Sequence, residues 1–244
     1  ASHGSDCGPM TTMLPLERPA RRRSGALRDW TVVAALVVLG AIPLIAGTLR
    51  VIQLAGGPSL MPTDERISGL PLPIVLHIVC ALIFVPLGAI QFAGSVCRRF
   101  PAWHRRAGRV AFAAGVGVVI SALLMTLFYS QKAGTGDLLY VMRLFFASLM
   151  GMSLVWALTS IRRGDVATHR AWMIRAYAIG IAAGTQAFTG GISEAIFGTG
   201  ILQDDLAKGS GWVINLAIAE WIIRRQPRNR AVPRRVVSAP LEVA

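Results

Sequence analysis

Six long runs of apolar residues, separated by short polar and charged stretches, dominate the chain. They cover about residues 30–54, 73–96, 107–129, 138–161, 171–197 and 210–224. An α-helix needs roughly 20 apolar residues to cross the hydrocarbon core of a bilayer. The pattern therefore predicts an all-α, polytopic transmembrane bundle of about six membrane-spanning helices. The last run is the shortest, and it carries Asn215 and Glu220.

The composition agrees with a membrane protein. Hydrophobic residues make up 54% of the 244 residues and charged residues only 15%, whereas a soluble domain carries about 25% charged residues. The formal net charge of +13 would indicate nucleic-acid binding in a soluble protein. The distribution of the charge along the chain decides between these interpretations.

The positive charges are sorted between alternate connections. Twenty of the 25 Lys and Arg residues lie in the two terminal tails or around the starts of the third and fifth runs. The others are Arg50, Arg66, Lys132, Arg143 and Lys208. Short basic loops face the cytoplasm, so the pattern predicts cytoplasmic termini and a multi-pass protein of the inner (plasma) membrane. The charge then serves orientation and contact with anionic inner-leaflet lipid, and nucleic acid is not an expected partner.

Three regions follow from this organisation. Residues 1–29 form a basic cytoplasmic tail, in which residues 1–9 (ASHGSDCGP) have the character of an expression remnant and are left out of the fold prediction. Residues 30–225 form the transmembrane helical domain. Residues 226–244 are basic and interrupted by proline, a composition typical of disorder.

Two segments on the predicted cytoplasmic side begin alike. HRRAGRV starts at His104 and HRAWMIR at His169, so a His-Arg pair stands at the mouth of two apolar runs. Pro101 suits the first turn of one helix and Asp165 is a good N-cap for the other. Because both helices run outward, the two histidines should lie at the same depth. The two loop-helix units also resemble a weak internal duplication, and duplicated pairs often build a site between them.

Three interpretations of this histidine pair stay open. Two neutral imidazoles on bundle helices can bind both axial positions of a haem iron, with Arg side chains beside the propionates. The same groups at helix N-termini can instead bind a lipid phosphate or an isoprenoid diphosphate. In the simplest interpretation the Arg residues are interfacial anchors beside hydrated histidines. The predicted cofactor-binding residues are His104, His169, Arg105, Arg109, Arg170 and Arg175, with the two histidines as the ligands of the haem iron.

A second polar group is expected on the outer side. His77, Arg143 and Glu194 should share one depth, and Gln91 is nearly in phase with His77 on the same helix face, roughly 21 Å deeper. Polar groups inside a membrane normally face the bundle interior, so these four side chains are predicted to form an outer polar cluster. The cluster is either a structural salt bridge beside a buried histidine or a site that handles protons or substrate.

The presence of His77 and Gln91 in one helix, followed by PAWHRRAGRV and GDVATHRAWMIRAYA, resembles a known family. This family, domain-of-unknown-function family 2306, groups bacterial multi-pass membrane proteins. The likeness covers about residues 70–190 and implies a membrane bundle with no established activity. The H-R-x-x-G-R entry more loosely resembles a helix start in cytochrome b561-type proteins, which carry His-ligated haems between paired helices. That likeness implies His104 and His169 as ligands, and the lack of a His in the fourth run departs from a two-haem pattern.

The leading functional prediction is electron transfer through one haem b near the cytoplasmic face, with a quinone or another redox partner. The alternatives are a haem-free protein that binds a phosphorylated lipid or isoprenoid, a small transporter or membrane enzyme, and a structural or assembly subunit. The sequence has no P-loop, HExxH or GxSxG motif, which argues against a stand-alone ATPase or hydrolase.

Overall fold

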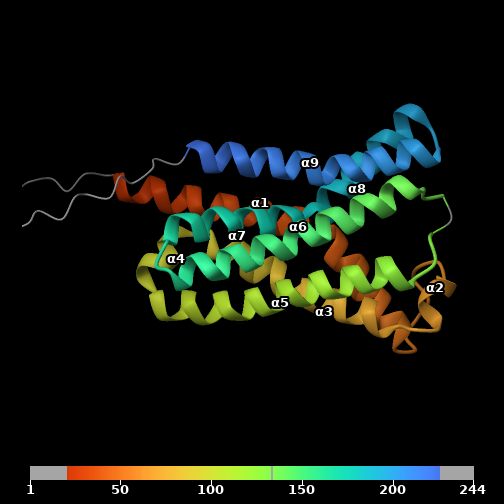
Figure 1. The fold of residues 1–244 in the computed structure, drawn as a ribbon, viewed down its shortest axis with the longest axis horizontal. Helices are drawn as coiled ribbons and strands as arrows, with labels where there is room; N and C mark the ends of the chain where they lie inside the picture. Colours follow the sequence, from red (N-terminus) through yellow and green to blue (C-terminus); the bar gives the residue numbers. More distant parts are fainter. Residues whose placement is uncertain (1–20, 133, 226–244) are drawn as a thin grey trace, which may run out of the picture.

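The long apolar runs fold into helices that lie side by side along one axis. The computed structural model describes residues 21–132 and 134–225, and all regular secondary structure in these ranges is helical. The predicted all-α class is confirmed. The helices, labelled in Figure 1, are α1 (Arg21–Leu54), α2 (Glu65–Ser68), α3 (Leu72–Gln91), α4 (Gly94–Arg99), α5 (Pro101–Phe128), α6 (Asp137–Arg162), α7 (Val166–Gly180), α8 (Ala182–Phe197) and α9 (Ile201–Arg225).

Within the described residues, four helices are long and apolar enough to cross a membrane. They are residues Asp29–Leu54 of α1 and the whole of α3, α5 and α6. These match the first four predicted runs, with two differences. α1 begins inside the predicted N-terminal tail, and α3 ends at Gln91 because the chain turns into the separate short helix α4. The rest of the N-terminal tail and the predicted C-terminal tail lie outside the described residues, and the fifth and sixth spans stay predictions.

The fifth predicted run is not one helix. It is divided at Ile181 into α7 and α8, and the N–H of Gly184 donates back to the carbonyl of Ile181 (3.0 Å). The side chain of Asn215 in α9 covers the break, because it donates to the Ala178 carbonyl (3.0 Å) and accepts from the Thr185 hydroxyl (2.8 Å). A neighbouring helix thus satisfies backbone groups that the break releases, as a membrane interior requires.

The last helix is longer than predicted. α9 starts at Ile201 instead of residue 210 and includes charged residues that the prediction left outside the span. One of them, Asp205, is only 1% exposed and accepts the backbone N–H groups of Gly136 (3.0 Å) and Leu139 (3.1 Å) at the start of α6. A carboxylate in this place satisfies free N–H donors and opposes the positive end of the helix dipole. The Asp205 carboxylate is therefore a buried cap that joins α9 to the start of α6.

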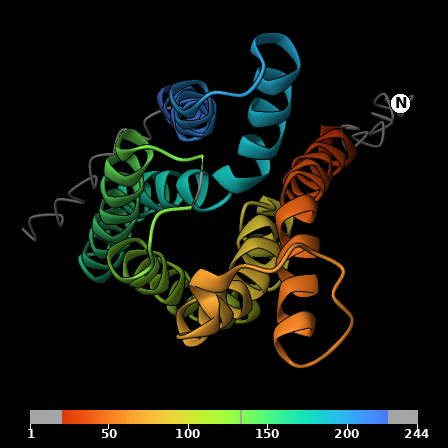
Figure 2. The same ribbon diagram turned by 90° about the vertical axis from the view of Figure 1, so that its right-hand side faces the viewer.

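Seen along the bundle axis, the helices form a ring (Figure 2). α1, α3, α5, α6 and α7 pack in that order, and contacts between α8 and α1 close the ring. α9 lies outside it, against α6, α7 and α8. The most extensive contacts join α3 to α5 and α6 to α7, which are the helices of the two units that the sequence relates as a weak duplication.

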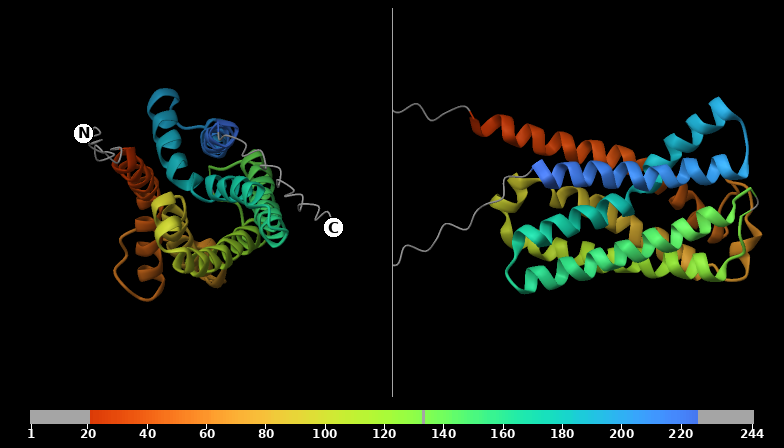
Figure 3. Two further views of the ribbon diagram at one scale, coloured as in Figure 1. Left: turned by 90° about the vertical axis from the view of Figure 1, so that its left-hand side faces the viewer. Right: turned by 45° about the horizontal axis from the view of Figure 1, so that its top comes forward.

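The two ends of the bundle differ in charge. One end, which we call the basic end, holds α4, the starts of α1, α5 and α7, and the ends of α6 and α9 (Figure 1, Figure 3). The opposite end, called the α2 end, holds α2 and the connections that follow α5 and α8. The grouping of the basic segments agrees with the charge pattern of the sequence. The side of the membrane that the basic end faces stays a prediction. The exposed arginines of the basic end include Arg98, Arg99, Arg105, Arg106, Arg162 and Arg163.

Tyr177 in α7 is buried among aromatic side chains. Its ring lies against Phe84 and Phe92, with centroid distances of 5.6 and 5.0 Å, and its hydroxyl donates to the Val85 carbonyl (2.9 Å). A Cβ at Gly88 would come within 2.4 Å of this ring, so glycine permits the close approach of α3 and α7. The cluster separates the basic end from a cavity in the other half of the bundle.

Candidate functional site

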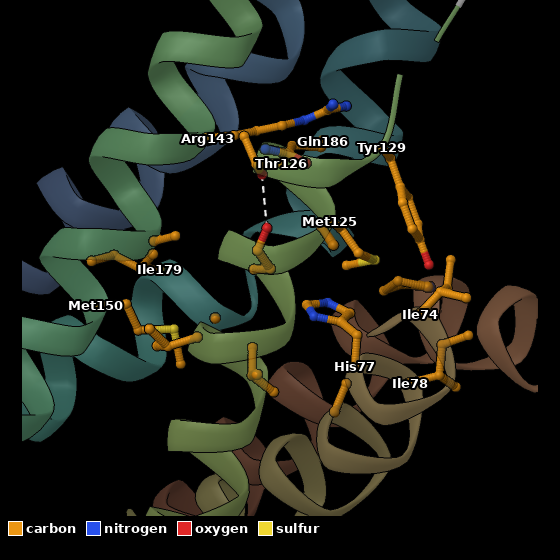
Figure 4. Close-up of a pocket in the computed structure, with 18 of the residues that line it drawn as sticks. Ile74, His77, Ile78, Met125, Thr126, Tyr129, Arg143, Met150, Ile179 and Gln186 are labelled. Atoms are coloured by element: carbon orange, nitrogen blue, oxygen red, sulfur yellow. Dashed lines mark hydrogen bonds between the residues drawn. The ribbon is translucent and has the colours of Figure 1, made fainter. Parts of the chain in front are cut away.

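A cavity of about 410 Å³ lies inside the ring of helices, towards the α2 end. Walls come from α1, α3, α5, α6, the α7–α8 break and Trp212 of α9. Most of the lining side chains are apolar, and Figure 4 shows several of them. Pockets of this size with apolar walls and a few polar groups are typical of small-molecule sites. The apolar lining includes Ile74, Ile78, Phe84, Met125, Met150 and Ile179.

Three polar residues of the cavity lie towards one end, and His77 lies apart from them (Figure 4). Arg143 of α6 and Gln186 of α8 lie close to Thr126 of α5, whereas Met150 and Ile179 lie at the other end (Figure 4). Thr126 is satisfied, because its hydroxyl donates to a carbonyl one turn earlier in α5 (2.7 Å). The Nε2 atom of Gln186 is buried and has no hydrogen-bond partner among the described residues.

Asp64 and Arg66 also border the cavity, beside α2. The Arg66 guanidinium donates to both carboxylate oxygens of Asp64, at 2.8 Å and 2.5 Å. This hydrogen-bonded pair holds the pKa of the Asp64 carboxyl below its usual range. The two charges therefore cancel at the rim, and neither is left for a ligand deeper in the cavity.

Arg143 is the charged group of the cavity that lacks such a partner. Within the described residues its side chain makes no salt bridge and no hydrogen bond. The carboxylates that attract it electrostatically are Asp205 and Asp204, but both are engaged elsewhere. Asp205 caps α6, and Asp204 is paired with Lys208.

His77 lines the same cavity from α3 (Figure 4). Its Nδ1 atom lies 3.1 Å from the Ser121 hydroxyl of α5. That hydroxyl donates to the carbonyls of Gly117 (2.6 Å) and Val118 (3.0 Å), so it accepts from an Nδ1–H of the imidazole. The neutral ring then keeps Nε2 as an acceptor.

The structure brings together two members of the predicted outer polar cluster, because His77 and Arg143 line one cavity. Glu194 is exposed and borders a separate depression beside Lys208, and no salt bridge joins it to Arg143. Gln91 lies at the basic end, where its Oε1 atom would be 3.4 Å from a Cβ on Gly108 of α5. These two side chains therefore lie away from the central cavity.

The predicted histidine pair lies at the basic end. Each His is the fourth residue of its helix, after Pro101 in α5 and after the N-cap Asp165 in α7. His169 Nδ1 lies 2.8 Å from the carbonyl of Ala157 in α6. His104 is half-buried, and its Nδ1 atom has no hydrogen-bond partner among the described residues. The His104 side chain interacts electrostatically with His169. Neither histidine borders the central cavity or the depression near Glu194.

The arginines of the predicted cofactor set have different environments. Arg105, Arg109 and Arg170 are exposed. Arg175 instead donates to both carboxylate oxygens of Glu220 in α9, at 2.5 and 3.1 Å, and its guanidinium lies 4.3 Å from the centre of the Trp172 ring. Arg175 therefore joins α7 to α9.

Two residues are not among the predicted site residues: Gln186, which lines the cavity, and Asp205, which caps α6. Gln186 was placed on a helix face that contacts other helices, with no decision about a ligand. Asp205 has no predicted role, because the N–H groups that it accepts, those of Gly136 and Leu139, lie more than 60 residues earlier in the chain. The roles of Gln186 and Asp205 depend on how α9 packs against the α7–α8 break and the start of α6, which is a tertiary property.

A family model described as "Predicted membrane protein (DUF2306)" matches residues 74–223, which is more than half of the 244-residue chain. The matched segment contains His77, Arg143 and Gln186, whereas α1 precedes it. No curated protein and no solved structure matches the chain, and nothing found supports the looser likeness to cytochrome b561-type proteins. The family description and the four membrane-length helices make this a multi-pass membrane protein that lies in a lipid bilayer.

Proposed function

The chain belongs to the DUF2306 family of predicted membrane proteins, and we propose that it binds a small amphipathic molecule in the cavity between its helices. The observation that carries the proposal is the cavity itself, with a volume of about 410 Å³, apolar walls and a few polar groups at one end. The proposal keeps the class of ligand that the sequence offered as an alternative to haem, a lipid or an isoprenoid. It places the binding site at the α2 end of the bundle instead of at the paired histidines.

The proposal includes a topology of six spans in the inner (plasma) membrane. α7 with α8, and α9, run beside the four candidate spans (Figure 1), and they complete the alternation of basic and non-basic connections. With the basic end in the cytoplasm, both termini are cytoplasmic. The cavity then lies in the outer half of the membrane.

The divided helix supports a binding role. Ile179, Gly180 and Ile181, at the end of α7 and at the break, all line the cavity. Irregular backbone at membrane depth is tolerated where it is buried in protein or lines a cavity. Discontinuous helices border the substrate sites of many transporters, so the break is where a transporter would bind its ligand.

Photolabelling tests the proposal. We expect a long-chain alcohol with a diazirine on its chain to label peptides around Met150 and Ile179 of the purified protein in lipid nanodiscs. The Ala147→Trp variant should lower this labelling at least fivefold, because Ala147 lines the cavity and an indole would fill much of it. Mass spectrometry of the labelled peptides gives the measurement.

The matched control is Ser148→Trp, which adds the same side chain at the next position, where the residue is exposed. This variant should label like the wild type. Labels confined to the lipid-facing surface of the wild type, or equal losses in the two variants, would contradict binding in the cavity.

Electron transfer through a haem b held by His104 and His169 is the second candidate function. His169 favours it, because an Nδ1–H donated to the Ala157 carbonyl leaves Nε2 free, and ligating histidines are usually oriented in this way. Exposed Arg105 and Arg170 would be available to propionates. The pair borders neither the central cavity nor the depression near Glu194, and for this reason the first proposal is preferred.

The second candidate makes its own prediction. Protein purified from cells supplied with a haem precursor should carry about one haem per chain, visible as Soret and α bands in a dithionite-reduced minus oxidised spectrum. His104→Ala and His169→Ala should each abolish the bands, because one axial ligand would be lost. A colourless wild-type protein would rule out the haem function and leave the cavity proposal untouched.

A further inference from the structure

We infer that the ligand of the cavity carries an anionic head group of the phosphate or carboxylate class. Arg143 and Gln186 bind the head group, and the apolar chain points towards Met150 and Ile179. This inference rests on the proposed function, because it names the chemistry of the molecule that occupies the cavity.

The first argument is charge. The charged side chains that line the cavity are Asp64, Arg66 and Arg143. The first two neutralise each other through two hydrogen bonds, so the guanidinium of Arg143 remains as an uncompensated positive charge. Arg143 is partly buried, and a charged group that is partly withdrawn from water is stabilised when a group of opposite charge pairs with it. An anion that enters the cavity supplies the missing partner, and a guanidinium can bind a phosphate or carboxylate through two parallel hydrogen bonds.

The second argument is the unused donor on the facing helix. Gln186 Nε2 is buried without a partner among the described residues, and Gln186 lines the same cavity as Arg143, towards the same end in Figure 4. Buried polar atoms in native proteins are nearly always hydrogen-bonded, and each exception calls for an explanation. An oxygen acceptor between α6 and α8 would satisfy both side chains. A cation would satisfy neither of them.

The third argument is the order of the lining along the cavity. Arg143 and Gln186 lie at one end, and Met150 and Ile179 lie at the other (Figure 4). Phe84 and Val85 line the apolar part from α3. A free inorganic anion would use only the polar end, whereas an amphiphile would occupy the whole cavity. The shape of the lining therefore favours a head group with a chain attached.

Matched probes of one chain length test the inference on the full-length protein in neutral nanodiscs. The probes are a diazirine-bearing alcohol, its phosphate monoester and its carboxylate. We expect the phosphate or the carboxylate to reach half-maximal labelling of the cavity peptides at a concentration at least tenfold below that of the alcohol. Arg143→Gln should raise the half-maximal concentration of the anionic probe about tenfold and so remove the preference for the anionic probe over the alcohol.

Lys208→Gln is the control, because it removes one positive charge at the same end but outside the cavity, where Lys208 is paired with Asp204. It should not change the preference for the anionic probe. Inorganic phosphate at millimolar concentration should not displace the alkyl phosphate. Displacement as effective as that by unlabelled dodecyl phosphate would overturn the amphiphile in favour of a free anion.

The two levels of the proposal fail separately. If the alcohol and both anionic probes label the cavity at equal concentrations, the cavity binds amphiphiles but the anionic head group is wrong. If no probe labels the cavity peptides, the proposed function is wrong. The comparison of probes on the wild-type protein decides the inference even if Arg143→Gln does not fold, and Arg143→Lys then provides a variant that keeps the charge but loses bidentate binding.

Discussion

The Asp205→Ala variant is expected to lose on the order of 3 kcal/mol of unfolding free energy. The Asp205 carboxylate is only 1% exposed, and it accepts the N–H of Gly136 at 3.0 and 3.2 Å and the N–H of Leu139 at 3.1 Å. Its removal leaves buried donors at the start of α6 without an acceptor and detaches α6 from α9. Intrinsic tryptophan fluorescence during thermal and detergent-induced unfolding of the purified protein provides the measurement.

The neighbouring carboxylate is the control for this variant. Asp204 is partly exposed and pairs with Lys208 one turn along α9, and such a pair contributes less than about 1 kcal/mol. The unfolding free energy of Asp204→Ala should therefore be close to that of the wild type. Asp205→Asn keeps one acceptor oxygen, so its unfolding free energy should lie between those of the wild type and Asp205→Ala. Equal losses in Asp204→Ala and Asp205→Ala would show that the cap does not hold α6 in place.

The apolar runs predicted the long membrane helices but did not predict where a helix is interrupted. α6 lies within one residue of its predicted bounds, and α1 and α5 end within one residue of theirs but begin earlier. A long uncharged run can cross a bilayer only as a helix, because its backbone groups must pair within the segment. The division of α7 from α8 at Ile181 could not be predicted, because the hydrophobic pattern continues through it. Its stabilising partner, Asn215, lies 34 residues later in the sequence and comes beside it only through the packing of α9.

The candidate site was predicted in part. Depth counting placed His77 and Arg143 in the same half of the bundle, and both line the central cavity, because each lies in the part of its helix nearest the α2 end. Depth alone does not say which way a side chain points. Glu194 shares the end of the bundle with Arg143 but lies on an exposed part of α8, and Gln91 belongs to the other end of α3. The ring order of the helices, which decides which faces meet, is a tertiary property.

The paired histidines illustrate the same limit. Their caps and their depth follow from local sequence, and α5 and α7 begin as Pro101 and Asp165 predicted. Their closeness depends on α6, which contacts both of their helices and provides the Ala157 carbonyl for His169. The sequence motif therefore marked two corresponding positions, and the cavity formed elsewhere, where unrelated polar residues from α3, α6 and α8 meet.

The Gly184→Ala variant is expected to lose about 3 kcal/mol of stability, the upper end of the usual range for overpacked sites. A Cβ at residue 184 would lie 2.1 Å from the carbonyl oxygen of Leu39 and 2.9 Å from its carbonyl carbon. These are backbone atoms of α1, so no side-chain rotation relieves the contact, and α1 and α8 must move apart. Small residues at crossings of transmembrane helices allow this kind of close approach. Thermal unfolding in detergent, followed by tryptophan fluorescence, measures the loss.

Gly191→Ala provides the matched control in the same helix, because a Cβ there meets nothing within 4 Å. Alanine is favoured over glycine inside a helix by roughly 1 kcal/mol, so this variant should be as stable as the wild type or slightly more stable. The α1–α8 contact closes the ring around the cavity, and Gly184→Ala should therefore also abolish photolabelling near Met150 and Ile179. A Gly184→Ala protein with wild-type stability and labelling would mean that α1 is not the wall of the cavity, and that the segment matched by the family encloses the ligand without it.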